Sequence, residues 1–184
     1  MADPALGPPD RLTVPTVVTD RLILRAWRPD DLDPYAHWNA DPEMMRYLSP
    51  IDRAGTFDMI AYLVGHWLLR GYGMWAVEDR QTGEWMGRAG LYEELGWPGT
   101  EMAWSIRRDR WGQGYATEAG SAVMWFGFEV LRLDRIISLT VPDNKASIRV
   151  ATKLGADMEK TIKMRGRDYL QFAIDRQTWT RRRG

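Results

Sequence analysis

The sequence contains no cysteine, and this absence excludes disulfides, thiolate metal ligands and a cysteine nucleophile. It has only two histidines, His37 and His66, too few for a multi-histidine metal site, and we expect both to lie on amphipathic helices. It also lacks any run of about 18 apolar residues that would span a bilayer. Residues 1–15 contain four prolines and no apolar core typical of a signal peptide. We therefore expect a cytoplasmic protein with no metal centre and no membrane contact.

The chain has 184 residues, 45% of them hydrophobic, which is enough apolar material for one core. We expect one domain over residues 19–179, a loosely attached N-terminal tail over 1–18 and a basic C-terminal tail over 180–184. Equal numbers of basic and acidic residues, 25 of each, argue against a DNA-binding protein. Residues 1–101 nevertheless hold nine basic and sixteen acidic side chains, a net charge of −7, and the remainder carries +7. This split indicates either two partners of different charge or an uneven, well-solvated surface.

Apolar periodicity and turn residues predict alternating strands and helices. Strands are predicted over 21–27, 74–78, 85–92, 101–106, 135–141, 158–164 and 167–174. Helices are predicted over 29–40, 54–70, 115–131 and 144–154. The segment 101–141 reads as strand, loop, helix, strand, which is long enough for a right-handed crossover between parallel strands. The other neighbours are hairpins. We therefore expect an α/β (α+β) fold with a mixed, mostly antiparallel sheet of about seven strands, one parallel pair and helices on both faces.

The stretch Arg107–Ala119 places two glycines between a strand and the start of a long helix. Free backbone N–H groups and the helix dipole favour an anion at such a position, and glycine lets the backbone approach it closely. The stretch is not a P-loop, because no lysine follows Gly114, and Thr117 stands where a dinucleotide fingerprint needs its third glycine. The residues alone leave two interpretations open, an anion site and a tight turn.

The motif Trp111–Ala119 resembles the acetyl-coenzyme A pyrophosphate loop of the GNAT N-acetyltransferase superfamily, in the RimJ/RimL branch that acetylates ribosomal-protein N-termini. Three further stretches resemble the family's opening strand, central strand and last-helix motif, and they follow in the expected order. They are Thr19–Arg25, Glu101–Ile106 and Asn144–Ala156.

The resemblance implies acetyl-CoA as co-substrate, without a metal, bound where the central strand splays from its parallel neighbour. Backbone groups of Trp104, Ser105 and Ile106 would then bind the pantetheine arm and polarise the thioester carbonyl. The pyrophosphate would lie on the loop, and charged residues near it would meet the outer phosphates. The implied cofactor-binding residues beyond the strand are Arg107, Trp111, Gly112, Gln113, Gly114, Tyr115, Ala116, Thr117, Asn144 and Ser147, with Arg108, Arg110, Lys145 and Arg149 as further phosphate candidates.

The implied reaction is direct attack of a neutral amine on the thioester. Glu101 is the candidate base, because strand alternation places it with Ala103 and Ser105 on one face of the strand; its alternative is a structural carboxylate. The tyrosine that many superfamily members use as the acid is absent, since Ala151 occupies that position. Ser147, three residues after Asn144, is the candidate to contact the sulfur, as an acid or only as a cofactor ligand.

We therefore expect an acetyl-CoA-dependent N-acetyltransferase whose acceptor is a protein N-terminus or a small-molecule amine, acting as a monomer or homodimer. The alternatives are a non-catalytic acyl-CoA-binding or sensing module and an acyltransferase with a larger donor. We expect the acceptor groove to form from residues 29–60, 93–100 and 164–168, and its acidic side chains would suit a cationic amine. These side chains are Asp31, Asp33, Asp41, Glu43, Asp52, Glu93 and Glu94.

Overall fold

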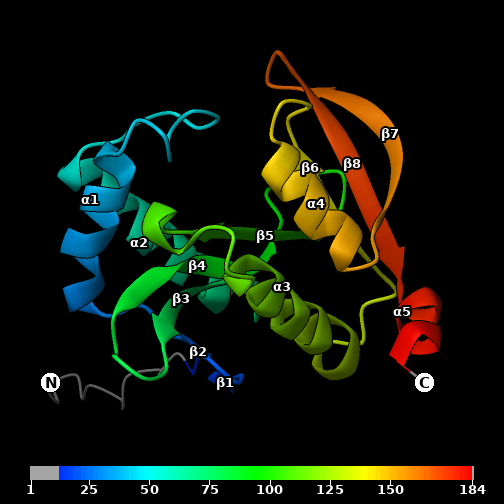
Figure 1. Cartoon of the computed structure of the whole chain (residues 1–184), viewed down its shortest axis with the longest axis horizontal. Helices are drawn as coiled ribbons and strands as arrows, with labels where there is room; N and C mark the ends of the chain where they lie inside the picture. Colours follow the sequence, from blue (N-terminus) through cyan, green and yellow to red (C-terminus); the bar gives the residue numbers. More distant parts are fainter. Residues whose placement is uncertain (1–12, 184) are drawn as a thin grey trace, which may run out of the picture.

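A computed structural model describes residues 13–183, which form one eight-stranded sheet surrounded by helices (Figure 1). The strands are β1 (Val17–Val18), β2 (Leu22–Arg25), β3 (Met74–Asp79), β4 (Trp85–Tyr92), β5 (Glu101–Ile106), β6 (Arg135–Thr140), β7 (Asp157–Met164) and β8 (Arg167–Asp175). The α-helices are α1 (Leu32–Ala40), α2 (Arg53–Arg70), α3 (Tyr115–Trp125), α4 (Lys145–Lys153) and α5 (Arg176–Arg183).

The strand order is β1-β2-β3-β4-β5-β6-β8-β7, and only the β5–β6 pair is parallel. The predicted fold class is therefore confirmed, including the crossover through α3 that joins the two parallel strands. The sheet has eight strands instead of about seven because β1, a pair of residues joined to β2, is too short to leave a periodic signal.

Some residues of each predicted tail belong to regular secondary structure. Most of the predicted N-terminal tail lies outside the described residues, but Val17–Val18 pair with β2 and the Trp75 indole N–H donates to the Pro15 carbonyl at 2.7 Å. At the other end, α5 continues through residues 180–183 of the predicted basic tail. Val17 and Val18 are held by a strand outside the predicted tail, whereas Thr180 and Arg181 bond within α5.

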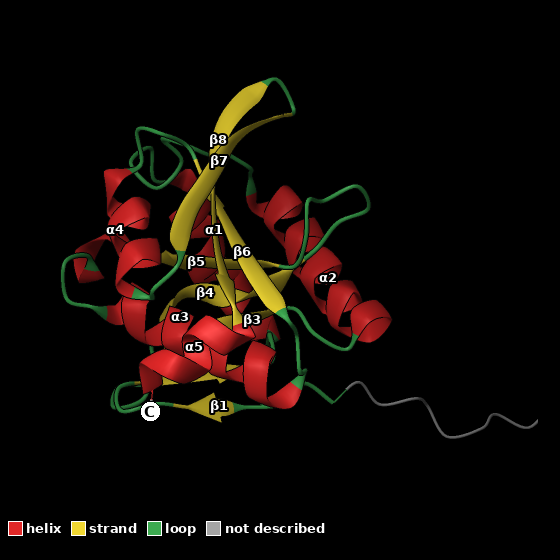
Figure 2. Cartoon of the chain, turned by 90° about the vertical axis from the view of Figure 1, so that its right-hand side faces the viewer, coloured by secondary structure: helices red, strands yellow, loops and turns green. Residues whose placement is uncertain are grey.

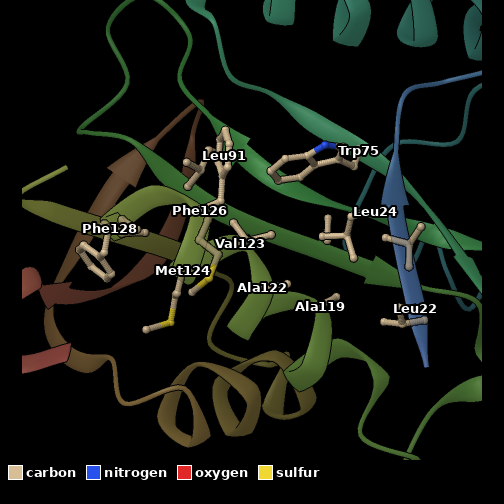
Figure 3. Close-up of a cluster of buried hydrophobic side chains, with 14 of the residues drawn as sticks. Leu22, Leu24, Trp75, Leu91, Ala119, Ala122, Val123, Met124, Phe126 and Phe128 are labelled. Atoms are coloured by element: carbon tan, nitrogen blue, oxygen red, sulfur yellow. The ribbon is translucent and has the colours of Figure 1, made fainter. Parts of the chain in front are cut away.

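The main core lies between the sheet and α3 (Figure 3). Trp75 and Leu91 from the sheet face Ala119 and Val123 from α3, and all four are completely buried. The predicted helix over 115–131 is instead α3 followed by a single π-helical turn, Phe126–Val130. Apolar spacing along the predicted helix favours Phe126 and Val130 as core positions; with the wider turn, Phe126 and Phe128 are buried and Val130 is exposed.

A second buried cluster covers the opposite face of the sheet. Tyr35 and Trp38 of α1 pack there against Ala76 of β3 and Trp85 of β4. The helix α2 flanks this cluster; its start is capped by Asp52, whose side chain accepts the Gly55 N–H, and it ends at Gly71 in the left-handed conformation. Two different faces of the sheet are thus fixed, one by α3 and one by α1. Among the described residues, no helix is both long and apolar enough to cross a membrane.

At Gly90 of β4, in the middle of the sheet, the backbone of Gly73 lies too close to admit a side chain. A Cβ atom there would lie 2.2 Å from the Gly73 carbonyl oxygen. We predict that Gly90→Ala lowers the free energy of unfolding by about 1–3 kcal/mol, because backbone must shift to admit the methyl group. Gly65→Ala is the matched control: its Cβ meets nothing within 4 Å inside α2, so it should raise stability by about 0.5–1 kcal/mol. Urea denaturation measures both, and equal effects would contradict the prediction.

Candidate active site

The two parallel strands separate almost as soon as they meet. Glu101 and Ile137 are the sole paired positions of β5 and β6, and the Ile137 N–H donates to the Thr100 carbonyl at 3.0 Å. Beyond this point β5 and β6 run in different directions (Figures 1 and 2). We call this point the fork. Past it, the edge of β5 that faces β6 has no partner strand.

The carboxylate of Glu101 lies in the fork. Its Oε1 accepts the Leu139 N–H at 3.2 Å, and its Oε2 accepts the Trp97 indole N–H at 2.8 Å. Burial raises the pKa of Glu101 to about 7, although these two hydrogen bonds and the positive charge of Arg88 act in the opposite direction. A carboxyl group that titrates near neutral pH is suited to exchange protons with an amine.

Strand alternation decides which backbone groups face the fork. The Ile106 carbonyl accepts the Trp111 indole N–H on the fork side, and the Arg107 N–H donates to the Met86 carbonyl on the β4 side. Even-numbered positions of β5 therefore present their backbone groups to the fork. Trp104 and Ile106 therefore present their backbone groups to the fork, whereas those of Ser105 point toward β4. The side chains follow the predicted alternation, with Met102 and Ile106 in the main core.

The glycine-containing loop presents a run of unused backbone donors at the start of α3. Gly112 and Gly114 adopt left-handed conformations, with φ of 74° and 85°, and no side chain caps the helix. Within the described part of the chain, no acceptor binds the N–H groups of residues 112–117, and the first bonded amide is that of Glu118. We call these six groups the amide cradle. Since exposed N–H groups at a helix start attract anions, the cradle fits a diphosphate.

A brace that the sequence interpretation missed holds the cradle in place. Glu118 accepts hydrogen bonds from the Thr19 hydroxyl and from the backbone and side chain of Arg21. Arg21 also donates to the Gln113 carbonyl at 3.0 Å and lies 4.1 Å from the centre of the Tyr115 ring. Burial alone would raise the pKa of Glu118, but these partners lower it overall. Both residues lie inside recognised motifs, and only the fold shows that they meet.

The helix α4 faces the fork from the β6 side. Asn144 caps it, since its side-chain oxygen accepts the Ser147 N–H at 3.1 Å, while the Ser147 hydroxyl has no partner among the described residues. Ala151, which replaces the expected tyrosine, is buried in the main core. The hydroxyl of Ser147 is thus the free polar side-chain group that this turn of α4 offers.

The predicted phosphate-binding cations differ in how far they are engaged. Arg107 pairs with Asp109 at 2.7 Å, Arg110 with Glu84 at 3.3 Å and Arg108 with Asp41 at 3.2 Å. Lys145 donates to the Pro142 carbonyl. Arg149, in contrast, is exposed and makes no hydrogen bond or ion pair with the residues that the structure describes. Arg149 is therefore the cation most available to a phosphate.

The acidic residues of the expected acceptor groove are almost all neutralised by the protein itself. Asp52 caps α2, and each of the others forms an ion pair with an arginine. The pairs are Asp31–Arg25, Asp33–Arg53, Asp41–Arg108, Glu43–Arg46, Glu93–Arg70 and Glu94–Arg165. The expectation that this acidity serves a cationic acceptor is not supported, because the carboxylates are occupied by structural partners.

Aromatic residues form the wall beside Glu101. Tyr92 packs edge-on against Trp97, whose indole holds the carboxylate, and stacks on His66. His66 is an α2 residue, as expected; its Nδ1 lies 2.7 Å from the Tyr72 carbonyl oxygen, and its Nε2 lies within 3.3 Å of both the backbone nitrogen and the carbonyl oxygen of Glu93. Both ring nitrogens of His66 are therefore engaged with backbone groups of the protein.

An unpaired strand edge beside an amide cradle defines a site for a ligand that contains both amide groups and phosphates. Residues 21–157 match the model of the acetyltransferase (GNAT) domain. The chain is 35% identical over 156 residues to YkkB of Bacillus subtilis (strain 168), covering 80% of this chain and 88% of that protein.

Solved structures agree with this match. The acetyltransferase from Agrobacterium tumefaciens str. C58 has a TM-score of 0.80 at 27% identity, covering 91% of this chain and 98% of its own. The ribosomal-protein-S5-alanine acetyltransferase from Vibrio fischeri shares the fold at a TM-score of 0.72 and 15% identity, covering 90% and 99%. The chain belongs to the GNAT acetyltransferase family, whose members take their acyl group from acetyl-CoA.

If the cradle holds the pyrophosphate, a carboxylate placed in it should repel that group. We predict that Gly114→Asp raises the Kd for CoA at least tenfold, which corresponds to about 1.4 kcal/mol. Gly83→Asp is the control, because Gly83 has a similar left-handed φ of 75° in the β3–β4 turn and open space around it. Isothermal titration calorimetry with CoA measures both. An unchanged Kd for Gly114→Asp would show that the cradle does not bind the pyrophosphate.

Proposed function

We propose that the protein transfers an acetyl group from acetyl-CoA to a primary amine, with Glu101 as the base. The observation that carries this proposal is the position of Glu101: a buried carboxyl group with a pKa of about 7 lies where β5 leaves β6. The cofactor residues proposed above surround the same fork. Within the family, the motifs at 111–119 and 144–156 favour the RimJ/RimL-like branch.

The residues of the chain account for the binding of the donor. Gly112–Thr117 would bind the pyrophosphate through their N–H groups, and Trp104 and Ile106 would bind the pantetheine amides as a further strand would. Acetyl-CoA supplies an activated thioester carbonyl. A fork-facing N–H of β5 would polarise that carbonyl as an oxyanion hole does.

The proton balance gives Glu101 its role. An ammonium acceptor must lose one proton before its nitrogen can attack, and Glu101 accepts that proton directly or through water. The new C–N bond forms as the C–S bond breaks, and the second proton of the amine ends on the thiol. An α-amine, with a pKa of about 7.7–8.0, needs less help than a lysine amine, with a pKa of about 10.4.

The pH profile of the reaction tests the role of Glu101. A panel of amines and N-terminal peptides is assayed for thiol release from acetyl-CoA. Below pH 7, log kcat/KM of the wild type should rise with slope 1 and then level off, since Glu101 must be deprotonated to take the proton of the ammonium acceptor. Glu101→Gln should be about 10²–10⁴-fold slower and should keep rising with slope 1 beyond pH 7, up to the pKa of the acceptor amine. Glu129→Gln, an exposed carboxylate of the π turn, is the control and should match the wild type.

A wild-type rate in Glu101→Gln, with a profile that still levels off near pH 7, would remove Glu101 from catalysis. Binding of acetyl-CoA without turnover of any amine would favour the alternative, a non-catalytic acyl-CoA-binding module, which the replacement of tyrosine by Ala151 keeps in consideration.

The role of Ser147 is tested by a separate variant. Coenzyme A thiol is a reasonable leaving group and serine a weak acid, so we propose that the hydroxyl mainly contacts the cofactor. Ser147→Ala should raise the KM for acetyl-CoA several-fold and change kcat less than threefold, as steady-state kinetics would measure. The helix cap should survive, because the donor to Asn144 is the backbone N–H of residue 147. A large fall in kcat at constant KM would instead identify Ser147 as the acid.

A further inference from the structure

Two arginines lie in one row across the sheet and differ in their partners. The register aligns Arg25 of β2 with Ala76, Ala76 with Arg88 of β4, and Arg88 with Ser105 of β5. Aligned residues share a face, here the face covered by α1. The guanidinium of Arg25 is buried and bonded to Asp31 and Glu78. Arg88 has no hydrogen bond or ion pair with any described residue, and its Nε is buried without a partner.

Aromatic rings hold Arg88 in this position. Its guanidinium carbon lies 5.7 Å from the ring centre of Tyr35 and 6.0 Å from that of Trp38. The same cluster contains two more buried donors without acceptors, the indole N–H groups of Trp38 and Trp85. A site with a fixed positive charge and no protein acceptor is complementary to an anionic group with two acceptor oxygens, such as a carboxylate.

The position of Arg88 relative to Glu101 fits a small acceptor. Glu101 lies opposite Tyr92, four residues from Arg88 along β4, which is roughly 13 Å between Cα atoms at the rise of a strand. Both side chains are long, and the charge of Arg88 acts on the carboxyl group of Glu101. The row between them consists of Gly90, without a side chain, and partly exposed Ala103. Because the Gly73 backbone occupies the position that a Cβ atom of Gly90 would take, the exposed part of this row lies at Ala103.

We propose that Arg88 binds a carboxylate of the acceptor, so that the acceptor is an amino acid or a similar small amino-carboxylate. This inference rests on the proposed function and deepens it. The amine would lie toward Glu101 and the fork, and the carboxylate toward Arg88. The occupied carboxylates of the groove agree, since Arg88 is the charge on this face that the protein leaves unneutralised.

The test compares L-amino acids with their carboxamides as acceptors. The wild type should prefer the carboxylates at least a hundredfold in kcat/KM. Arg88→Met should lower kcat/KM for the carboxylates at least thirtyfold and change it less than threefold for the carboxamides. The control is Arg132→Met, which removes an exposed arginine paired with Glu129 outside the groove and should keep the preference. CoA binding by calorimetry should be unchanged in both variants.

Stability gives an independent readout. Because Arg88 has no hydrogen bond or ion pair with the described residues, Arg88→Met should melt no lower than the wild type, whereas Arg25→Met, which leaves the buried Asp31 without its cation, should melt lower. A matching fall in both variants would assign Arg88 a structural role.

The experiments distinguish a failure of the carboxylate site from a failure of the proposed acetyl transfer. Equal rates for carboxylates and carboxamides, or equal losses for both in Arg88→Met, would overturn the carboxylate site while acetyl transfer stands. If no amine is acetylated, calorimetry with N-acetyl amino acids and their amides, in the presence of CoA, still decides. Carboxylate-selective binding that Arg88→Met abolishes supports the site, and its absence refutes it.

Discussion

The hydrogen bond from the Leu139 N–H to Glu101 is the interaction on which the site depends. In a continuous parallel pair, alternate N–H groups of β6 bond to β5. The Leu139 N–H, two residues after that of Ile137, would then bond to a carbonyl of β5. Here the carboxylate of Glu101 takes the place of that carbonyl. Because β6 keeps its hydrogen bond, β5 is free to diverge, and its edge remains open to a ligand. An unpaired buried N–H would instead cost about 1–3 kcal/mol and favour closure of the fork. The same carboxylate lies at the position of the proposed base, so architecture and chemistry share one residue.

Much of the fold was predictable because its signals are local. Hairpins around residues 79–83 and 165–166, the periodic α2 and the capped α4 each follow from neighbouring residues. The errors fall where distant contacts decide. The strand β1 depends on pairing with β2, and the π turn after α3 depends on burying two phenylalanines. Such features need the sheet already in place, and no window of sequence contains that information.

The candidate site also combines residues that local sequence signals predict with residues that only distant contacts reveal. Gly112, Gly114 and the cap at Asn144 lie in contiguous motifs, and the sequence alone is enough to propose them. The brace from Arg21 to Glu118 spans 97 positions, and the unpaired state of Arg88 is defined by what surrounds it in space. Ser105 shows a finer limit. Its motif is recognisable, but only the register with Arg88 shows that its backbone faces β4.

The opposite charges of the two halves of the chain take on a different meaning in three dimensions. Several acidic residues of the first half pair with basic residues of the second, as in Asp41–Arg108, Glu84–Arg110 and Glu94–Arg165. These pairs join the two halves of the chain, so much of the charge is used within the protein. Among the described residues, the groups left without a protein partner are more informative than the net charge; they include the amides before α3 and the guanidinium groups of Arg88 and Arg149. All of these groups are donors, and under the proposed function each is complementary to negatively charged oxygen atoms on a ligand.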